Sequence, residues 1–274
     1  MNIKFALCQM NVVDDKNENI QKATSMILEA IEKNADFIIL PEMFNCPYEN
    51  EKFVEYCEFE KSSYTLNKIS KLAAENNVYI LAGSIPEKEK DNIFNTSYLF
   101  DKNGDMITKH RKMHLFDIDV KDKIYFKESD TLTAGNEFTI ADTEFGKIGI
   151  GICYDVRFPE LARIMVEQGA EILIYPGAFN LTTGPAHWEL LFRARALDNQ
   201  VFCIGVAPAL DENANYNSYG HSIITNPWGE VVIEGDYNEE LLIAKIDLNE
   251  VKRIKEELPL IKNKRNDLYQ VKKI

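Results

Sequence analysis

Residues 147–160 carry a cysteine at a place where a side chain is free to react. The apolar run predicts a buried strand over residues 147–152, a sharp turn at Cys153 and a helix that opens at Pro159. Proline suits the first turn of a helix, and the N-terminus of a helix carries a partial positive charge. We therefore expect this turn to favour the thiolate of Cys153, the form of cysteine that attacks a carbonyl carbon.

Two other reactive groups also follow predicted strands. Glu42 comes after a short apolar strand at residues 37–40, which Pro41 stops, and Lys112 lies in a basic loop after a strand at residues 106–109. In α/β sheets, ligands bind in the crevice outside the carboxyl ends of the strands. We expect Glu42, Lys112 and Cys153 to meet at one such edge, where a base, a cation and a nucleophile together suit acyl transfer.

The segments around these three residues resemble the carbon–nitrogen hydrolase (nitrilase) superfamily, which uses a Glu-Lys-Cys triad. The resemblance rests on Leu40-Pro41-Glu42, Arg111-Lys112-Met-His114-Leu and Gly151-Ile-Cys153-Tyr-Asp-Val-Arg157-Phe-Pro-Glu-Leu161. Further stretches are similar to the ω-amidase branch: Tyr175-Pro-Gly-Ala-Phe179-Asn-Leu-Thr-Thr183, Arg195-Ala-Leu-Asp198-Asn199 and Asn226-Pro-Trp228-Gly229. The pattern of strands and helices predicts an α/β protein, and the resemblance sharpens this to a four-layer α-β-β-α sandwich.

The resemblance implies a role for each catalytic residue. Glu42 takes the thiol proton, and Cys153 attacks the amide carbon and becomes a thioester. Lys112 stabilises the oxyanion together with the backbone N–H of Tyr154. Glu128 aligns with a second glutamate that members of the superfamily place beside the lysine. It either holds the ammonium and orients the amide, or only caps a turn.

A substrate carboxylate has one predicted clamp. Arg157 lies four residues after the nucleophile, and its planar fork matches two oxygens. The alternative is an ordinary surface salt bridge. The resemblance adds Tyr48, Phe179 and Thr183 to the substrate-binding residues, beside Tyr154.

The resemblance implies an ω-amidase that releases ammonia from short 2-oxo dicarboxylic acid monoamides such as 2-oxoglutaramate and 2-oxosuccinamate. An N-carbamoyl-amine amidohydrolase, or another amidase or nitrilase of the superfamily, is the enzymatic alternative. A catalytically silent binding or scaffold protein of the same fold is the alternative outside enzymes, and the intact triad counts against it.

Composition limits the partners and the compartment. The net charge of −13, from 31 basic and 44 acidic residues, argues against nucleic acid and anionic membranes as partners. Five cysteines without a C-x-x-C pair, and no apolar signal segment, predict a cytoplasmic protein. The expected ligand is a small amide, and the resemblance implies a homodimer or higher homo-oligomer.

We expect no cofactor and no metal. His110 and His114 are four residues apart, but no third ligand accompanies them and Lys112 between them would repel a cation. Hydrogen bonding or loop packing is the expected role of these histidines. His187 and Trp188 are expected at the pocket edge or a dimer interface.

The chain shows no Pro/Gly-rich linker, so residues 1–274 are predicted to form one domain, with residues 261–274 a basic tail or interface arm. Residues 110–136 are predicted to be a long functional loop. The remaining predicted helices lie at residues 15–34, 64–75, 160–168 and 186–199. The remaining predicted strands lie at residues 3–9, 78–83, 94–100, 138–143, 172–175, 201–206, 222–225 and 231–234.

Overall fold

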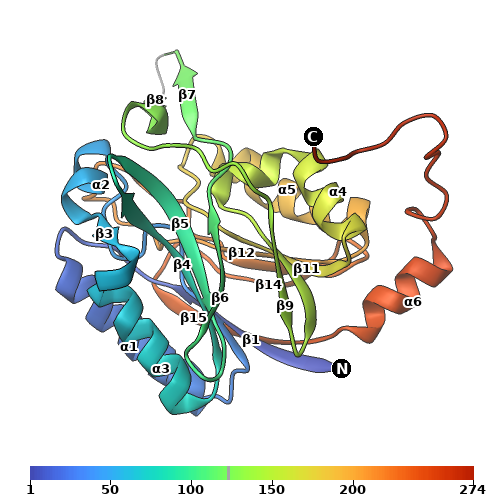
Figure 1. Ribbon diagram of the computed structural model, residues 1–274, viewed down its shortest axis with the longest axis horizontal. Coiled ribbons are helices and arrows are strands. Elements are labelled where there is room, and N and C mark those ends of the chain that lie inside the picture. Colours follow the sequence, from blue (N-terminus) through green and yellow to red (C-terminus); the bar gives the residue numbers. More distant parts are fainter. Residues whose placement is uncertain (122–123) are drawn as a thin grey trace.

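Two β-sheets lie face to face in the computed structural model, which describes residues 1–121 and 124–274 (Figure 1). The first sheet has β1 and β2 at its centre, and β3 (Glu58–Phe59) pairs with β4. Its strands follow the order β15 (Glu240–Asp247), β1 (Asn2–Gln9), β2 (Phe37–Ile39), β4 (Tyr79–Glu89), β5 (Asn92–Phe100) and β6 (Met106–Arg111).

The second sheet is built in the same way around parallel strands. Strands β10, β11 and β12 run parallel, and antiparallel strands flank them on both sides. Their order is β14 (Val231–Glu234), β13 (Ile223–Thr225), β12 (Phe202–Val206), β11 (Ala170–Pro176), β10 (Gly146–Ile150) and β9 (Thr139–Thr143).

Alternating side chains explain why the two sheets stack. In β1, Phe5 and Leu7 face the second sheet, whereas Ala6 and Cys8 face helices on the outside. Strands that are covered on both faces read as continuous apolar runs, as β1 and β10 do. The inner core joins Phe5 and Leu7 to Ile148 of β10 and to many further side chains from both sheets.

Helices cover the outer face of each sheet. Helices α1 (Lys16–Glu32) and α3 (Tyr64–Asn76) pack on the first sheet, and α4 (Pro159–Glu167) and α5 (Gly184–Asn199) pack on the second. Asp15 caps α1 by accepting the N–H groups of Asn17 and Glu18, at 2.8 and 3.0 Å. The layers confirm the predicted α-β-β-α sandwich.

Several elements were not predicted. They are helices α2 (Asn50–Tyr56) and α6 (Asn249–Glu257), strand β15 and a 3-10 helix at Glu60–Ser62, although Val251 and Ile254 of α6 are buried at helical spacing. The predicted loop at residues 110–136 contains strands β7 (Asp117–Val120) and β8 (Ile124–Lys127) and a 3-10 helix at Glu128–Asp130. In β7, Asp117 and Asp119 alternate with Ile118 and Val120, but none of the four side chains is fully buried.

The C-terminal segment leaves the body of the protein after α6, and its end returns to the vicinity of α4 (Figure 1). Lys264 pairs with Glu167 at the end of α4, and Lys273 pairs with Glu137. A role for this segment as an interface arm stays a prediction. No helix in residues 1–121 or 124–274 is both long and apolar enough to span a membrane.

Candidate active site

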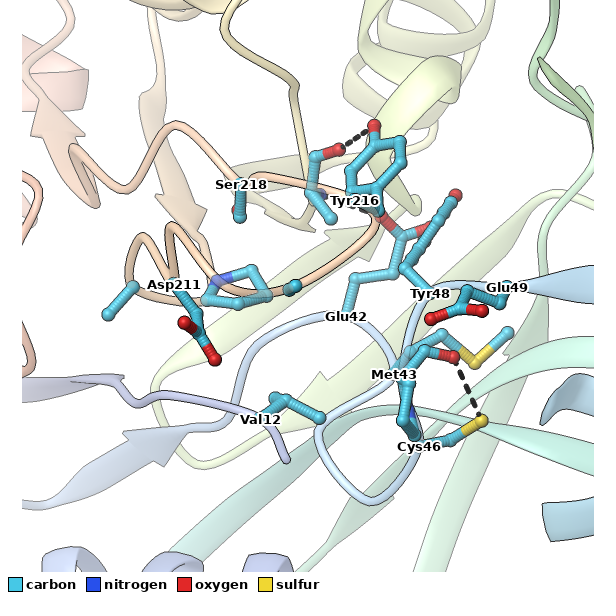
Figure 2. A pocket seen from close by; sticks show the side chains of 14 residues that line it. Val12, Glu42, Met43, Cys46, Tyr48, Glu49, Asp211, Tyr216 and Ser218 are labelled. Atoms are coloured by element: carbon cyan, nitrogen blue, oxygen red, sulfur yellow. Dashed lines mark hydrogen bonds between the residues drawn. The ribbon is translucent and has the colours of Figure 1, made fainter. Parts of the chain in front are cut away.

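A small cavity lies beside the Glu42 carboxylate. Its volume is about 40 Å³, and Tyr48 and Tyr216 lie next to Glu42 in its wall (Figure 2). The rings of these two tyrosines contact each other, with centroids 4.6 Å apart. The same tyrosines line a surface groove of about 320 Å³. The two tyrosines thus line both this groove and the cavity beside Glu42.

Glu42 is held by a turn against a bulge in β4. Pro41 ends β2, and the backbone carbonyl of Pro41 accepts the N–H of Ser84 at 3.2 Å. A Cβ atom at Gly83 would lie 1.8 Å from the carbonyl oxygen of Leu40, so only glycine lets the two segments approach this closely. The bulge interrupts the pairing of β4 with β5 at this point.

The buried Glu42 carboxylate accepts hydrogen bonds on both of its oxygens. Oε1 accepts the Asn95 side-chain amide at 2.8 Å and the Lys112 ammonium at 2.9 Å, and Oε2 accepts the backbone N–H of Ala178 at 2.7 Å. Burial raises the pKa of Glu42, against the opposing charge of Lys112 and with a smaller contribution from Glu128. Glu42 is therefore oriented as an acceptor and is more basic than an ordinary glutamate.

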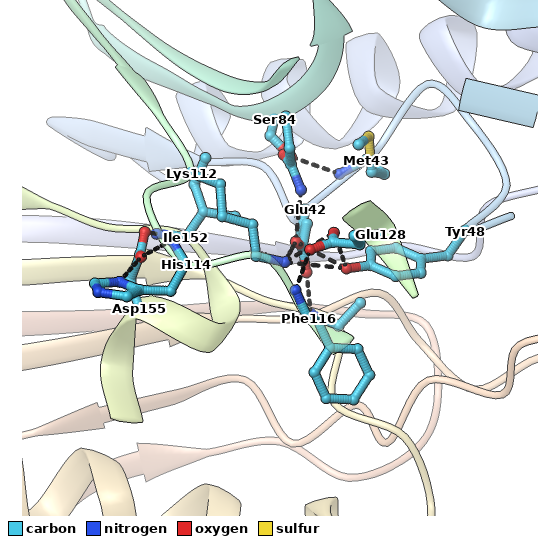
Figure 3. A network of polar contacts seen from close by, with 12 residues as sticks. Glu42, Met43, Tyr48, Ser84, Lys112, His114, Phe116, Glu128, Ile152 and Asp155 are labelled. Atoms are coloured by element: carbon cyan, nitrogen blue, oxygen red, sulfur yellow. Dashed lines mark hydrogen bonds and ion pairs between the residues drawn. The ribbon is translucent and has the colours of Figure 1, made fainter. Parts of the chain in front are cut away.

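Lys112 lies directly after β6 and is fully buried. Its backbone N–H donates to the Asn95 carbonyl at 2.8 Å, which continues the pairing with β5. Its ammonium donates to Glu42 and Glu128, both at 2.9 Å, and to the Tyr48 hydroxyl at 3.1 Å (Figure 3). Burial works to lower the pKa of Lys112, but the two carboxylates outweigh it and raise that pKa well above the ordinary value. Lys112 therefore stays a cation.

Glu128 holds the Lys112 ammonium and also closes a turn, whereas its part in orienting the amide stays a prediction. Its side chain accepts the Lys112 ammonium at 2.9 Å, the Tyr48 hydroxyl at 2.7 Å and the backbone N–H of Phe116 at 2.6 Å. Its backbone carbonyl also accepts the N–H of Leu132 at 2.7 Å, which closes the turn. The side chain holds the ammonium in place, and the backbone shapes the loop that carries it.

Cys153 begins a 3-10 helix, Cys153–Arg157, and its backbone is in the left-handed region with φ of 46°. Few residues other than glycine adopt this conformation, and such outliers gather at active sites. A Cβ atom at Gly177 would lie only 3.0 Å from the Cα of Cys153, so the end of β11 passes directly beside the nucleophile.

The expectation that the turn favours the thiolate is wrong. The 3-10 helix separates Cys153 from α4, which begins at Pro159 as predicted. Burial raises the pKa of Cys153 well above the ordinary value, and the Glu42 carboxylate adds to this shift. The thiol therefore keeps its proton until a base takes it, and Glu42 is the neighbouring base.

The three groups come from two sheets and not from the edge of one. Glu42 follows β2 and Lys112 follows β6, both in the first sheet, whereas Cys153 follows β10 in the second. Stacking of the sheets brings the strand ends together. A buried base, a cation and a thiol in mutual reach are the groups that acyl transfer through a covalent intermediate requires.

Arg157 ends the 3-10 helix beside the nucleophile. Its guanidinium lies over the Phe179 ring at 4.6 Å and over the Tyr154 ring at 5.6 Å, and Nη1 contacts His187 Nδ1 at 3.1 Å. Nε is buried without a hydrogen-bond partner. Burial lowers the pKa of Arg157. Among residues 1–121 and 124–274, no carboxylate lies within 4.0 Å of this guanidinium, so these residues provide no partner for the surface salt bridge that was the predicted alternative.

The other predicted pocket residues have distinct surroundings. Phe179 is buried and packs edge-on against Trp188 at 5.0 Å. The Thr183 hydroxyl donates to the Asn180 side chain at 3.2 Å at the start of α5. Tyr154 packs edge-on against Phe116 of the loop and against Phe158, directly before α4. Tyr48 differs most from its predicted role, because its hydroxyl belongs to the buried charge network.

The histidines near Lys112 hydrogen-bond to a carboxylate. His110 Nε2 lies 3.0 Å from Asp155 Oδ2, and His114 Nδ1 lies 2.7 Å from Oδ1. This geometry agrees with the hydrogen-bonding role predicted for them. In the part of the chain that the structure describes, no group of three or more His, Cys, Asp or Glu side chains is arranged to hold a metal ion. Trp188 is a core residue, 1% exposed. His187 contacts Arg157, and its place at the pocket edge or a dimer interface stays a prediction.

Sequence reasoning did not identify three groups that contact the site. Asn95 and the backbone N–H of Ala178 orient Glu42, and Tyr216 donates to the Ala178 carbonyl at 2.6 Å. A single asparagine in a strand, a backbone amide and an isolated tyrosine give no local signal. Asp155 was present in the quoted motif, but only the structure shows what it contacts.

Comparison with known proteins identifies relatives along the whole chain. The sequence profile described as carbon-nitrogen hydrolase matches residues 4–256. Omega-amidase NIT2 of Bos taurus is 47% identical over 268 residues, covering 98% of this chain and 97% of that protein. Omega-amidase NIT2 of Homo sapiens is 46% identical with the same coverage. The crystal structure of Saccharomyces cerevisiae Nit3, a member of branch 10 of the nitrilase superfamily, is 39% identical with a TM-score of 0.89, covering 97% of this chain and 96% of that chain.

Proposed function

Because the chain belongs to the carbon–nitrogen hydrolase family, a family of hydrolases of non-peptide C–N bonds, we propose that it is an ω-amidase. Its substrates would be the terminal amides of short 2-oxo dicarboxylic acids, such as 2-oxoglutaramate and 2-oxosuccinamate. Relatives at 46–47% identity over nearly the full length carry the name omega-amidase, which supports this activity.

The first half of the reaction breaks the C–N bond. Glu42 takes the thiol proton while the sulfur of Cys153 attacks the amide carbon, and the carbonyl oxygen becomes an oxyanion. Lys112 stabilises this oxyanion together with the Tyr154 N–H, because the first N–H groups of a helix have no acceptor within the helix. Glu42 then gives its proton to the departing nitrogen. Ammonia leaves and a thioester remains.

The second half breaks the C–S bond. Glu42 takes a proton from water, the resulting hydroxide attacks the thioester carbon, and the sulfur leaves as the dicarboxylate is formed. Glu42 returns the proton to the sulfur. Throughout the cycle Glu128 keeps the ammonium of Lys112 charged and fixed, so the oxyanion needs no reorganisation of the site.

The observation that carries the substrate assignment is Arg157. A guanidinium beside the nucleophile, stacked on Phe179 and without a carboxylate partner in the described residues, offers its fork to an anion. A substrate carboxylate supplies that anion. A cationic N-carbamoyl amine would meet the same positive charge and be repelled, which favours an ω-amide of a diacid.

The test is ammonia release by the purified protein. We expect turnover of 2-oxoglutaramate and 2-oxosuccinamate, and its loss in Cys153→Ala. Cys203→Ala, at a buried thiol in β12, is the matched control and should retain activity. Turnover of N-carbamoylputrescine in place of the keto-amides would refute the substrate assignment, and full activity of Cys153→Ala would refute the mechanism.

We also propose that the protein is a homodimer in the cytoplasm. Leu190 and Leu197 lie seven residues apart on one face of α5 and are 65% and 43% exposed, and the neighbouring Trp228 is 50% exposed. Contiguous exposed apolar side chains of this kind mark association surfaces. Five cysteines without a disulfide support a reducing compartment. Light scattering tests the dimer by comparing the molar mass of the unaltered protein with that of Leu190→Glu. An unchanged molar mass would contradict the proposal that this surface forms the dimer interface.

A further inference from the structure

Asp155 is a buried carboxylate that the reaction itself does not use. It lies in the 3-10 helix two residues after Cys153 and is fully buried. Its Oδ2 accepts the backbone N–H of Ile152 at 3.0 Å, and its Oδ1 accepts the backbone N–H of His114 at 3.0 Å. The Oδ2 atom also lies 3.0 Å from His110 Nε2, and the Oδ1 atom also lies 2.7 Å from His114 Nδ1. The carboxylate therefore contacts four nitrogen atoms on three residues (Figure 3 shows His114 and Ile152).

These partners belong to two catalytic segments. Ile152 immediately precedes the nucleophile, whereas His110 and His114 lie two residues before and two residues after Lys112. Asp155 is thus the point where the segment that carries the ammonium is fastened to the turn that carries the thiol. The stacking of His114 on Phe158, with centroids 3.6 Å apart, strengthens the same connection.

The hydrogen-bonding pattern requires a carboxylate at this position. Each oxygen of Asp155 accepts one backbone N–H, and a backbone N–H cannot become an acceptor. An asparagine side chain would place its NH₂ group against one of these donors in either orientation. Hydrogen bonds from His110 and His114 outweigh the effect of burial and hold the pKa of Asp155 well below the ordinary value. The group is therefore an anion at neutral pH.

We propose that Asp155, with His110 and His114, is a positioning residue that fixes the distance between Lys112 and Cys153. Asp155 acts through Lys112 and Cys153 and does not touch the substrate. The inference rests on the proposed function for the roles of Lys112 and Cys153. A misplacement of about 1 Å far from the reacting atoms can cost about 10²-fold in rate. Freeing this connection should therefore lower kcat and leave KM nearly unchanged.

The experiment compares Asp155→Asn with Asp36→Asn. Asp36 also accepts a backbone N–H, that of Lys4 at 2.8 Å, but it precedes β2 and lies at the opposite end of that strand from Glu42. We expect Asp155→Asn to lose about 10²-fold in kcat with KM within about threefold of the unaltered enzyme, and Asp36→Asn to be unchanged in both. A kcat for Asp155→Asn within threefold, or a loss that falls on KM alone, would overturn the proposal.

Near-UV circular dichroism shows whether Asp155→Asn is folded. If it is not folded, two variants of His114 test the proposal instead. His114→Leu removes the side-chain donor to Asp155, whereas His114→Asn keeps an N–H near the same place. We expect a loss of about tenfold in kcat for the leucine variant and near-normal kcat for the asparagine variant. Equal values for the two would overturn the proposal.

The failure of the proposed function gives a different result. If the unaltered protein releases ammonia from none of the amides, the ω-amidase assignment fails, and the rate at which iodoacetamide alkylates Cys153 replaces kcat as the readout. Asp155→Asn should then react about tenfold more slowly, since the turn that aligns the thiol with Glu42 is loosened. An equal alkylation rate would refute the positioning role.

Discussion

Arg157 gives the sharpest test of the substrate assignment. Replacing it with methionine keeps most of the apolar stem that packs near Phe179 and removes the charged fork. Replacing it with lysine keeps the charge but cannot form two parallel hydrogen bonds or stack as a plane on the ring. The two variants therefore separate the contribution of charge from that of geometry.

The expected magnitude follows from the surroundings of the guanidinium. A hydrogen bond to a charged group contributes about 1.5–3 kcal/mol, and Arg157 is partly buried and has no carboxylate partner within the described residues to compete with the substrate. We therefore assign about 3 kcal/mol to the pair, which is about 10²-fold in kcat/KM for Arg157→Met. The lysine variant should lose about tenfold, because it keeps one of the two hydrogen bonds.

The assay compares kcat/KM for 2-oxosuccinamate and for a neutral amide of similar length, such as butyramide. The loss should be confined to the charged substrate, so the ratio of the two kcat/KM values should fall by about 10²-fold in Arg157→Met. Arg163→Met, in α4 beyond the nucleophile turn, is the matched control and should leave the ratio unchanged. An equal loss on both substrates would refute the clamp.

Three further predictions test the charges of the site and its support. Glu42→Gln should lose at least about 10²-fold in kcat. In the unaltered enzyme, the raised pKa of Glu42 should place the acid limb of the kcat/KM profile above pH 4.5, and a limb at or below that pH would contradict its role as the base. Glu128→Gln should lower kcat by about 10²-fold, because Lys112 loses a fixed anion. An unchanged kcat would mean that Glu128 only shapes the turn. Although burial opposes it, hydrogen bonding from Arg111 lowers the pKa of Glu87 to about 2. This carboxylate therefore stabilises the fold above about pH 4.5 and loses that contribution as the pH falls toward 2. Glu87→Gln should lower the free energy of unfolding by about 2 kcal/mol at pH 7. In this variant the free energy of unfolding should also fall less steeply as the pH decreases.

The sequence predicted the parts of the site that local patterns encode. Apolar runs ended by Pro41 or by a turn located the strands before Glu42 and Cys153, and the fold of the family followed from motifs near them. The structure adds what depends on distant residues. Strand β15 pairs with β1 across almost the whole chain, and no local pattern specifies such a partner. The same reason explains why Asn95 and Ala178 were not predicted as partners of Glu42.

The prediction that the turn before the helix favours the thiolate failed for a physical reason that sequence reasoning cannot supply. A helix N-terminus favours an anion, but the magnitude depends on burial and on other charges within a few ångströms. Two carboxylates and one ammonium share the buried space beside the thiol, so an additional negative charge on sulfur is opposed. These contacts form only when the two sheets stack.

The same charge balance connects the mechanism to the choice of substrate. Glu42 and Glu128 share the single ammonium of Lys112, which leaves an excess of carboxylate groups in the site. Burial is the main cause that raises the pKa of Glu42, and Glu128 adds a smaller contribution, which moves that pKa toward the range in which a general base is most effective. A site with such an excess would repel a substrate that carries a carboxylate. Arg157, beside the nucleophile and without an anionic partner in the described residues, supplies the missing positive charge. A single arginine thus allows the site to keep a strong base and still bind an anion, which is why its removal should penalise charged amides and spare neutral ones.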